Sequence, residues 1–142
     1  MSADIKHIKI ISPDGLSETV FGEQVSESAY RLLENPVFNC RITYGTTVKV
    51  EADKDGELVV IKILRASDYT TRRFLLPSSL SNTNFADKIG NRIIEAGGTW
   101  EVVMGGLAFV HFPKTSTFNL NKLFEEIGCH LTELIDDEKA DT

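Results

Sequence analysis

The first half of the chain contains short runs in which apolar and polar residues alternate. Five runs rich in β-branched and aromatic residues are separated by turn-forming residues, and they cover residues 7–12, 18–25, 29–33, 46–52 and 57–64. The Asp55-Gly56 pair between the last two runs is typical of a hairpin turn. We therefore expect a small antiparallel β subdomain or partial barrel over residues 1–66.

The second half mixes strand-like runs with segments of helical spacing. Helices are predicted over residues 84–98 and 119–128, with Asn84 and Asn119 placed to cap their first turns. Strands are predicted over residues 71–77, 99–104, 107–112 and 130–135. The order β-α-β-β-α-β is that of a ferredoxin-like split motif. We expect an α+β protein in which this unit spans residues 67–136 and an acidic tail spans residues 137–142.

A two-residue turn at Gly105-Gly106 suits a type I′ hairpin. With that turn, Trp100 pairs with His111, and alternate side chains share one face of the sheet. The face opposite the helices then carries an apolar patch formed by Trp100, Val102, Met104, Leu107 and Phe109. Such a patch needs a cover, and the candidates are the N-terminal β half, a second copy of the chain and a ligand.

Charge is distributed unevenly along the 142 residues, whose formal net charge is -6. Seven of the 21 acidic residues follow Phe124, where Lys139 is the one basic residue, so the preceding part of the chain is neutral. We interpret the acidic end as a solvated terminus, with a segment that engages a basic partner as the alternative.

Neither a membrane span nor a secretory leader is evident. No apolar run approaches the roughly 20 residues of a transmembrane helix, and the first ten residues do not resemble a signal peptide. Cys40 and Cys129 form no CxxC pair, which suits a reducing compartment. We expect a cytoplasmic protein without a membrane partner.

The segment RASDYTTRRF, residues 65–74, concentrates three arginines and four hydroxyl groups in ten residues. Strand alternation sends Arg72 and Arg73 to opposite faces, so one ligand cannot contact both. One hypothesis is a structural clamp between the two halves, in which an arginine at the joint pairs with a carboxylate such as Asp68. The other hypothesis is an anion site that combines one arginine with a hydroxyl group from Ser67, Thr70 or Thr71.

The segment GLAFVHF, residues 106–112, resembles the RNP1 motif of the RNA recognition motif family and falls on the third strand of the expected split motif. Phe74 and Phe109 would then be stacking rings on the outer sheet face, with His111 nearby and Arg72 or Arg73 beside them. The competing interpretation is that both rings are buried between layers. The resemblance makes a single-strand nucleic-acid or nucleotide binder an alternative function.

Residues typical of catalysis are few and scattered. His7, His111 and His130 lie on separate strand-like segments, and no hydrolase, phosphate-loop or zinc motif is present. Cys129-His130 would hold a metal with His111 only if their strands met, so we expect no metal and no cofactor. An enzyme with an unrecognised site at the joint between the two halves is a further alternative.

Several short segments together resemble the bacterial family catalogued as domain of unknown function 4265. Its members carry W-A-E-like, N-x-P-F, Y-G-D, S-x-x-T-x-R and V-P-P segments in this order. The corresponding segments here are Phe21-Gly22-Glu23, Asn35-Pro36-Val37-Phe38, Tyr44-Gly45-Thr46, Ser67 to Arg73 and Phe112-Pro113-Lys114. The resemblance covers residues 17–136 and implies the two-part architecture without implying an activity.

Small size, acidity and the lack of a catalytic set favour a non-catalytic protein-interaction module. The expected partner is another protein or a second copy of the chain, and the most concrete role is immunity-type binding of a basic protein. The candidate binding residues are Arg72, Arg73, Ser67, Thr71, Phe74, Trp100, Phe109 and His111.

Overall fold

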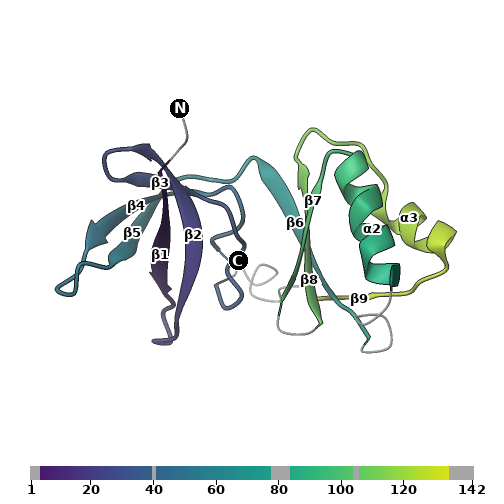
Figure 1. Cartoon of the computed structure of the whole chain (residues 1–142), viewed down its shortest axis with the longest axis horizontal. Helices are drawn as coiled ribbons and strands as arrows, with labels where there is room; N and C mark the ends of the chain where they lie inside the picture. Colours follow the sequence, from purple (N-terminus) through teal and green to yellow (C-terminus); the bar gives the residue numbers. More distant parts are fainter. Residues whose placement is uncertain (1–3, 40, 78–83, 104–105, 135–142) are drawn as a thin grey trace. The chain divides into compact units, whose positions relative to one another are not determined.

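The computed structural model describes residues 4–39, 41–77, 84–103 and 106–134, and their arrangement is shown in Figure 1. The chain divides into two compact units, Met1–Asp68 and Tyr69–Thr142, named here unit 1 and unit 2. The sheets are mostly antiparallel and unit 2 adds two helices, so the expected α+β class is confirmed. None of the described helices is long and apolar enough to cross a membrane.

Unit 1 is a closed barrel of five strands in sequence order. The strands are β1 (Ile5–Ile11), β2 (Ser17–Ser26), β3 (Ala29–Leu32), β4 (Thr47–Ala52) and β5 (Leu58–Arg65). Consecutive strands pair antiparallel, and a short parallel pairing of β1 with β5 closes the barrel. Inward side chains fill the interior, as expected for a small barrel: Ile8, Ile10, Val20, Tyr30, Leu32, Ile42, Val48 and Val50.

The hairpin predicted between β4 and β5 is present. Asp53 organises its turn, because the Asp53 carboxylate accepts the backbone N–H groups of Asp55 and Glu57, both at 2.9 Å. Gly56 has a φ of 80°, a left-handed conformation that glycine adopts without steric cost. The Asp55-Gly56 signal therefore marked a real turn.

Unit 2 is a four-stranded sheet with two helices on one face, as Figure 1 shows. The strands are β6 (Tyr69–Leu75), β7 (Thr99–Val103), β8 (Leu107–Pro113) and β9 (Thr132–Leu134), and the helices are α2 (Asn84–Glu95) and α3 (Leu120–Ile127). The strand order is β7-β8-β6-β9, and every pairing is antiparallel. The core between helices and sheet consists of Phe74, Leu76, Ile89, Ile93, Ala108, Val110, Leu120, Leu123, Phe124 and Leu131.

Helix α3 begins and ends as its sequence predicts. The Asn119 side chain accepts the backbone N–H of Lys122 at 3.0 Å, which satisfies one otherwise unpaired donor of the first turn. Gly128 ends the helix in a left-handed conformation with a φ of 81°. These caps fix where the apolar stripe of α3 meets the sheet.

The pairing of β7 with β8 corrects the predicted register. Trp100 lies opposite Val110 rather than opposite His111, because three residues, 104–106, separate the paired strand ends instead of two. A shift of one residue sends every side chain of a strand to the other face. Trp100 accordingly packs against the helix-side core, whereas Phe109 lies on the opposite face. The predicted outer patch of Trp100, Val102, Met104, Leu107 and Phe109 is therefore wrong as a set, and Met104 and Gly105 lie outside the described residues.

Candidate binding site

The arginine-rich segment, residues 65–74, crosses the boundary between the two units. Arg65 forms an exposed ion pair with Asp68 at 3.2 Å. Asp68, the carboxylate that we expected to pair with Arg72 or Arg73, therefore has a different partner. Residues 69–74 belong to β6, whose alternation directs Arg72 to the helix side and Arg73 to the opposite face. The two arginines therefore belong to different surfaces.

Arg72 is anchored by a carboxylate from β9. Its Nε and Nη2 atoms donate to the two oxygens of Glu133 at 2.8 and 2.7 Å, and Nη2 also donates to Asn121 Oδ1 at 3.0 Å. The hydrogen bonds with Glu133 raise the pKa of Arg72 and lower the pKa of Glu133. They stabilise the charged form of both groups, and this effect outweighs the cost of burial. Both groups are charged at neutral pH, and the pair fixes the guanidinium in place.

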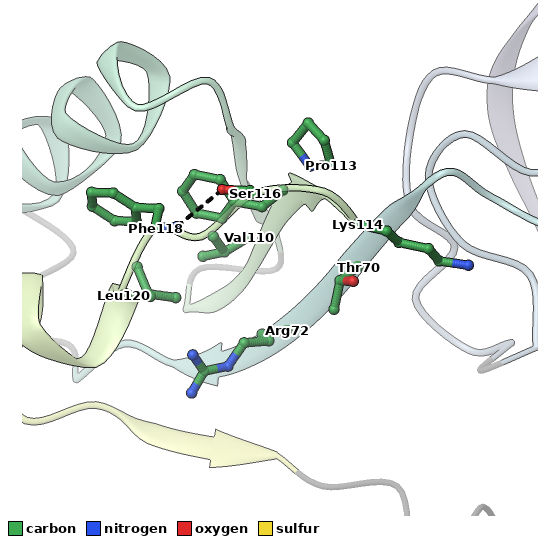
Figure 2. A pocket seen from close by; sticks show the side chains of 9 residues that line it. Thr70, Arg72, Val110, Pro113, Lys114, Ser116, Phe118 and Leu120 are labelled. Carbon is green, nitrogen blue, oxygen red and sulfur yellow. Dashed lines mark hydrogen bonds between the residues drawn. The ribbon is translucent and has the colours of Figure 1, made fainter.

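A pocket of about 170 Å³ lies beside Arg72 and is shown in Figure 2. Its apolar wall comes from β8 and from the segment that leads into α3, and it consists of Val110, Phe112, Pro113, Phe118 and Leu120. Its polar lining consists of Thr70, Arg72, Lys114 and Ser116. None of these described lining residues is acidic, so the pocket combines an apolar wall with a cationic rim.

Three local features hold the pocket wall in shape. The rings of Phe112 and Phe118 are stacked with centroids 5.1 Å apart, and the Ser116 hydroxyl oxygen accepts the Phe118 N–H at 3.2 Å. Behind Phe112 stands Gly98, where a Cβ atom would lie 2.7 Å from the Phe112 ring and 2.8 Å from the backbone oxygen of His111. Any larger residue at position 98 would displace the ring that lines the pocket.

A second hollow of about 300 Å³ lies at the end of α3. Its lining consists of Phe74, Asn121, Phe124, Glu125, Cys129, His130, Leu131 and Glu133. Burial raises the pKa of the Cys129 thiol, which keeps the thiol protonated and weakly nucleophilic at neutral pH. Among the described residues no group of three histidine, cysteine or acidic side chains is arranged to hold a metal ion.

The sheet face opposite the helices carries a polar network of three residues. Thr71 Oγ1 lies 2.8 Å from His111 Nδ1, and His111 Nε2 lies 2.5 Å from Glu101 Oε2. His111 and Phe109 are fully buried, and the Arg73 guanidinium lies 5.6 Å from the centre of the Phe109 ring. Because the His111 imidazole is buried, it has no exposed surface with which to contact a substrate.

The predicted site residues are thus spread over several places. Arg72 lines the pocket of Figure 2, and Phe74 is buried in the core, edge-on to Phe124 at 5.2 Å. Thr71, Arg73, Phe109 and His111 share the opposite face, Trp100 lies on the helix side, and Ser67 belongs to unit 1. Lys114, Ser116 and Phe118 also line the pocket but were not among the predicted binding residues. They belong to the loop that precedes the cap of α3, and binding residues are common in such loops.

Three of the segments on which the family resemblance rests meet at Tyr44. The buried Asn35 side chain accepts the Tyr44 N–H at 2.8 Å, and the Ser67 hydroxyl donates to the Tyr44 carbonyl at 2.5 Å. Within the Tyr44-Gly45-Thr46 segment, the Thr46 hydroxyl accepts the Thr43 N–H at 3.1 Å. These segments therefore build one polar cluster in unit 1 that fixes the loop before β4.

Comparison with solved structures finds a chain described as the novel crystal structure of a hypothetical protein from Neisseria gonorrhoeae. It is 16% identical, the alignment covers 94% of each chain, and the TM-score is 0.62, so the two proteins share a fold. No curated protein matches the chain. The family model named Domain of unknown function (DUF4265) matches residues 18–134. Because this match spans most of the chain, the protein belongs to the DUF4265 family.

Proposed function

We propose that this protein is a non-catalytic protein-interaction module whose unit 2 binds a short extended segment of another protein. The observation that carries the proposal is the pocket of Figure 2, in which an apolar wall is flanked by Arg72 and Lys114 without an acidic residue in its described lining. The segment that fits this chemistry has one apolar side chain between two acidic ones.

The size of the pocket supports recognition of a single side chain. A cavity of roughly 150 Å³ is enough to hold a benzene ring, whereas sites for drug-sized molecules have roughly 300–1,000 Å³. The pocket of about 170 Å³ therefore suits one phenyl or leucine side chain. Burying such a side chain stabilises a complex by about 1.5–3 kcal/mol before the ordering costs of association.

The charges around the pocket support acidic neighbours for that side chain. Figure 2 shows the side chains of Arg72 and Lys114 extending in opposite directions, with Thr70 between them. Glu133 neutralises much of the charge on Arg72, but no described carboxylate forms an ion pair with Lys114. Lys114 is therefore the stronger attraction for an acidic group, and the rim disfavours the basic partner of an immunity-type protein.

We also propose that unit 2 has a ferredoxin-like arrangement. The strand order β7-β8-β6-β9 supports this arrangement. In such a motif the helices and the loop before the second helix stand on one side of the sheet. Nucleic-acid binding on the opposite face is the weaker candidate, because the Phe109 ring is fully buried and offers no surface for a base to stack on.

Titration with short capped peptides, followed by NMR of the backbone amides, tests the proposal. We expect acetyl-Glu-Phe-Glu-amide to shift the amides of Val110, Ser116 and Phe118. The glutamine analogue acetyl-Gln-Phe-Gln-amide should bind about two- to fivefold more weakly, and acetyl-Glu-Ala-Glu-amide at least about tenfold more weakly. Lys114→Gln should remove the preference for glutamate, whereas Lys122→Gln, an exposed control on α3, should leave it intact.

Equal binding of the glutamate and glutamine peptides would contradict the acidic specificity. Tighter binding of acetyl-Lys-Phe-Lys-amide would instead favour a basic partner. If none of these peptides shifts the amides around the pocket, unit 2 does not bind peptides at this place.

A further inference from the structure

The barrel of unit 1 brings two lysines directly opposite each other. Lys49 on β4 and Lys62 on β5 are a cross-strand pair in the antiparallel ladder. Side chains at directly opposed positions have their Cβ atoms about 5 Å apart, and like charges there destabilise the sheet. The pair is unfavourable for the barrel by itself, and an anionic group bound between the two lysines would relieve the repulsion.

No described carboxylate forms an ion pair with either lysine. Other cations on strands of the barrel have acidic partners: Lys6 pairs with Asp4, Lys9 with Glu57, Arg31 with Glu23 and Arg65 with Asp68. None of the ion pairs among the described residues includes Lys49 or Lys62. Lys49 and Lys62 therefore lie opposite each other without an ion-pair partner among the described residues, in a chain whose formal net charge is -6.

Irregular pairing surrounds Lys62 with exposed apolar side chains. The register of β5 against β4 shifts between Val60 and Lys62, and again between Ile63 and Arg65, so Ile61 and Leu64 are extra residues on β5. Such bulges break the alternation of a strand and redirect side chains. All positions from Ile61 to Arg65 are exposed, with Ile61 at 47% and Leu64 at 46%.

We propose that this surface, named here the lysine face and consisting of Lys49, Lys62, Ile61 and Leu64, binds an acidic and aliphatic segment of another polypeptide chain. Carboxylates of the segment lie between the two ammonium groups, and its aliphatic side chains cover the apolar residues of β5. The lysine face belongs to unit 1, so the proposal is independent of the pocket in unit 2.

A polypeptide fits the lysine face better than a nucleic acid does. Recognition of single-stranded nucleic acid relies on exposed aromatic rings that stack on bases. The one aromatic residue of β3, β4 and β5 is Tyr30, which is buried in the barrel core. Exposed isoleucine and leucine beside lysine match aliphatic and acidic side chains instead.

The test uses the full chain and the probe acetyl-Glu-Val-Glu-Val-Glu-amide at low ionic strength. We expect the probe to shift the amides of β4 and β5, and the glutamine analogue to bind about fivefold or more weakly. The double substitution Lys49→Gln and Lys62→Gln should weaken binding about tenfold. Lys54→Gln, which removes the same charge in the turn between these strands, should have little effect.

A second measurement separates a binding role from a local structural one. If the lysines are kept for a partner, Lys62→Gln should raise the melting temperature of the free protein by about 1–4 °C, because it removes the repulsion from Lys49. A lower melting temperature would show that Lys62 stabilises the barrel itself and would overturn the proposal.

Three binding outcomes would also overturn it. One is equal binding of the glutamate and glutamine probes. Another is tighter binding of oligothymidylate than of the glutamate probe, which would assign the surface to nucleic acid. The third is binding of the probe by a chain that ends at Leu134 but not by the full chain, which would make the acidic C-terminal residues the occupant.

Discussion

Arg72 on β6 and Glu133 on β9 form a two-point ion pair at the edge of the unit 2 sheet, with nitrogen to oxygen distances of 2.8 and 2.7 Å. The short strand β9 pairs with β6 at three positions, so this ion pair is a substantial part of what holds β9 to the sheet. Its strength depends on the ionisation of Glu133.

Glu133→Gln should lower the free energy of unfolding by about 0.5–1 kcal/mol at pH 7, a value that allows for the partial exposure of both side chains. The pKa of Glu133 is lower in the folded than in the unfolded chain. Its stabilisation is therefore complete above the ordinary pKa of glutamate and is lost as the pH falls through the folded-state pKa. Urea denaturation should show the difference at pH 7, and the difference should shrink progressively as the pH is lowered below the ordinary pKa of glutamate.

The control for that prediction is Glu126→Gln. Glu126 contacts Arg92 at 3.4 Å and both side chains are half exposed, so the substitution should cost less. A difference between wild type and Glu133→Gln that persists unchanged in acid would mean that the charge of Glu133 is not what stabilises β9.

Asn35→Ala should destabilise unit 1 by about 1–3 kcal/mol, because it leaves the partly buried Tyr44 N–H without the oxygen of the buried Asn35 side chain that accepts it at 2.8 Å. Chemical denaturation monitored by circular dichroism measures the change. Asn91→Ala, an exposed substitution on α2, is the control and should change stability by no more than about 0.5 kcal/mol. Equal stability of wild type and Asn35→Ala would show that the polar cluster around Tyr44 is dispensable.

Gly98→Ala should cost about 1–3 kcal/mol or more, since the new methyl group would lie within 2.8 Å of both the Phe112 ring and a backbone oxygen. The backbone contact cannot be relieved by a side-chain rotation. Because Phe112 lines the pocket, Gly98→Ala should also weaken the binding of acetyl-Glu-Phe-Glu-amide. Gly15→Ala, at a turn glycine with open space around its Cβ position, should leave peptide binding unchanged, whatever it costs in stability.

Thr71→Val removes the hydroxyl group that contacts His111 Nδ1 at 2.8 Å and keeps the shape of the side chain. We expect it to lower the free energy of unfolding by about 0.5–1.5 kcal/mol. In a His111→Leu background the same substitution should cost much less, because the partner is already gone. A double-mutant cycle by urea denaturation tests this coupling, and additive effects would show that the hydroxyl and the imidazole do not interact.

Unit 1 has its own closed barrel and its own core, so residues 1–68 should fold without unit 2. A dispersed amide NMR spectrum and a cooperative unfolding transition would demonstrate this. A shorter chain ending at Ala66 lacks the Ser67 hydroxyl that donates to Tyr44, and it should be less stable. Equal stability of the two chains would show that residues 67 and 68 do not contribute to folding of unit 1. The boundary expected from the sequence at residue 66 would then describe the folding unit as well as the observed boundary at residue 68 does.

Features that depend on near neighbours could be predicted from the sequence alone. The β4–β5 turn follows from Asp53 and Gly56, and the ends of α3 follow from Asn119 and Gly128, because caps and turns act within a few residues. Alternation along β6 also placed Arg72 and Arg73 on opposite faces before any pairing was known.

Contacts between residues that are distant in the sequence could be read only from the folded chain. One extra residue in the β7–β8 connection moved Trp100 to the helix side, since register shifts exchange the two faces of a strand. The partner of Arg72 is 61 residues away in Glu133, and Lys49 faces Lys62 because of bulges in β5 that no local pattern marks. Strand pairing depends on loop lengths and on packing of the whole unit, so the pocket and the lysine face emerge only when the chain is folded.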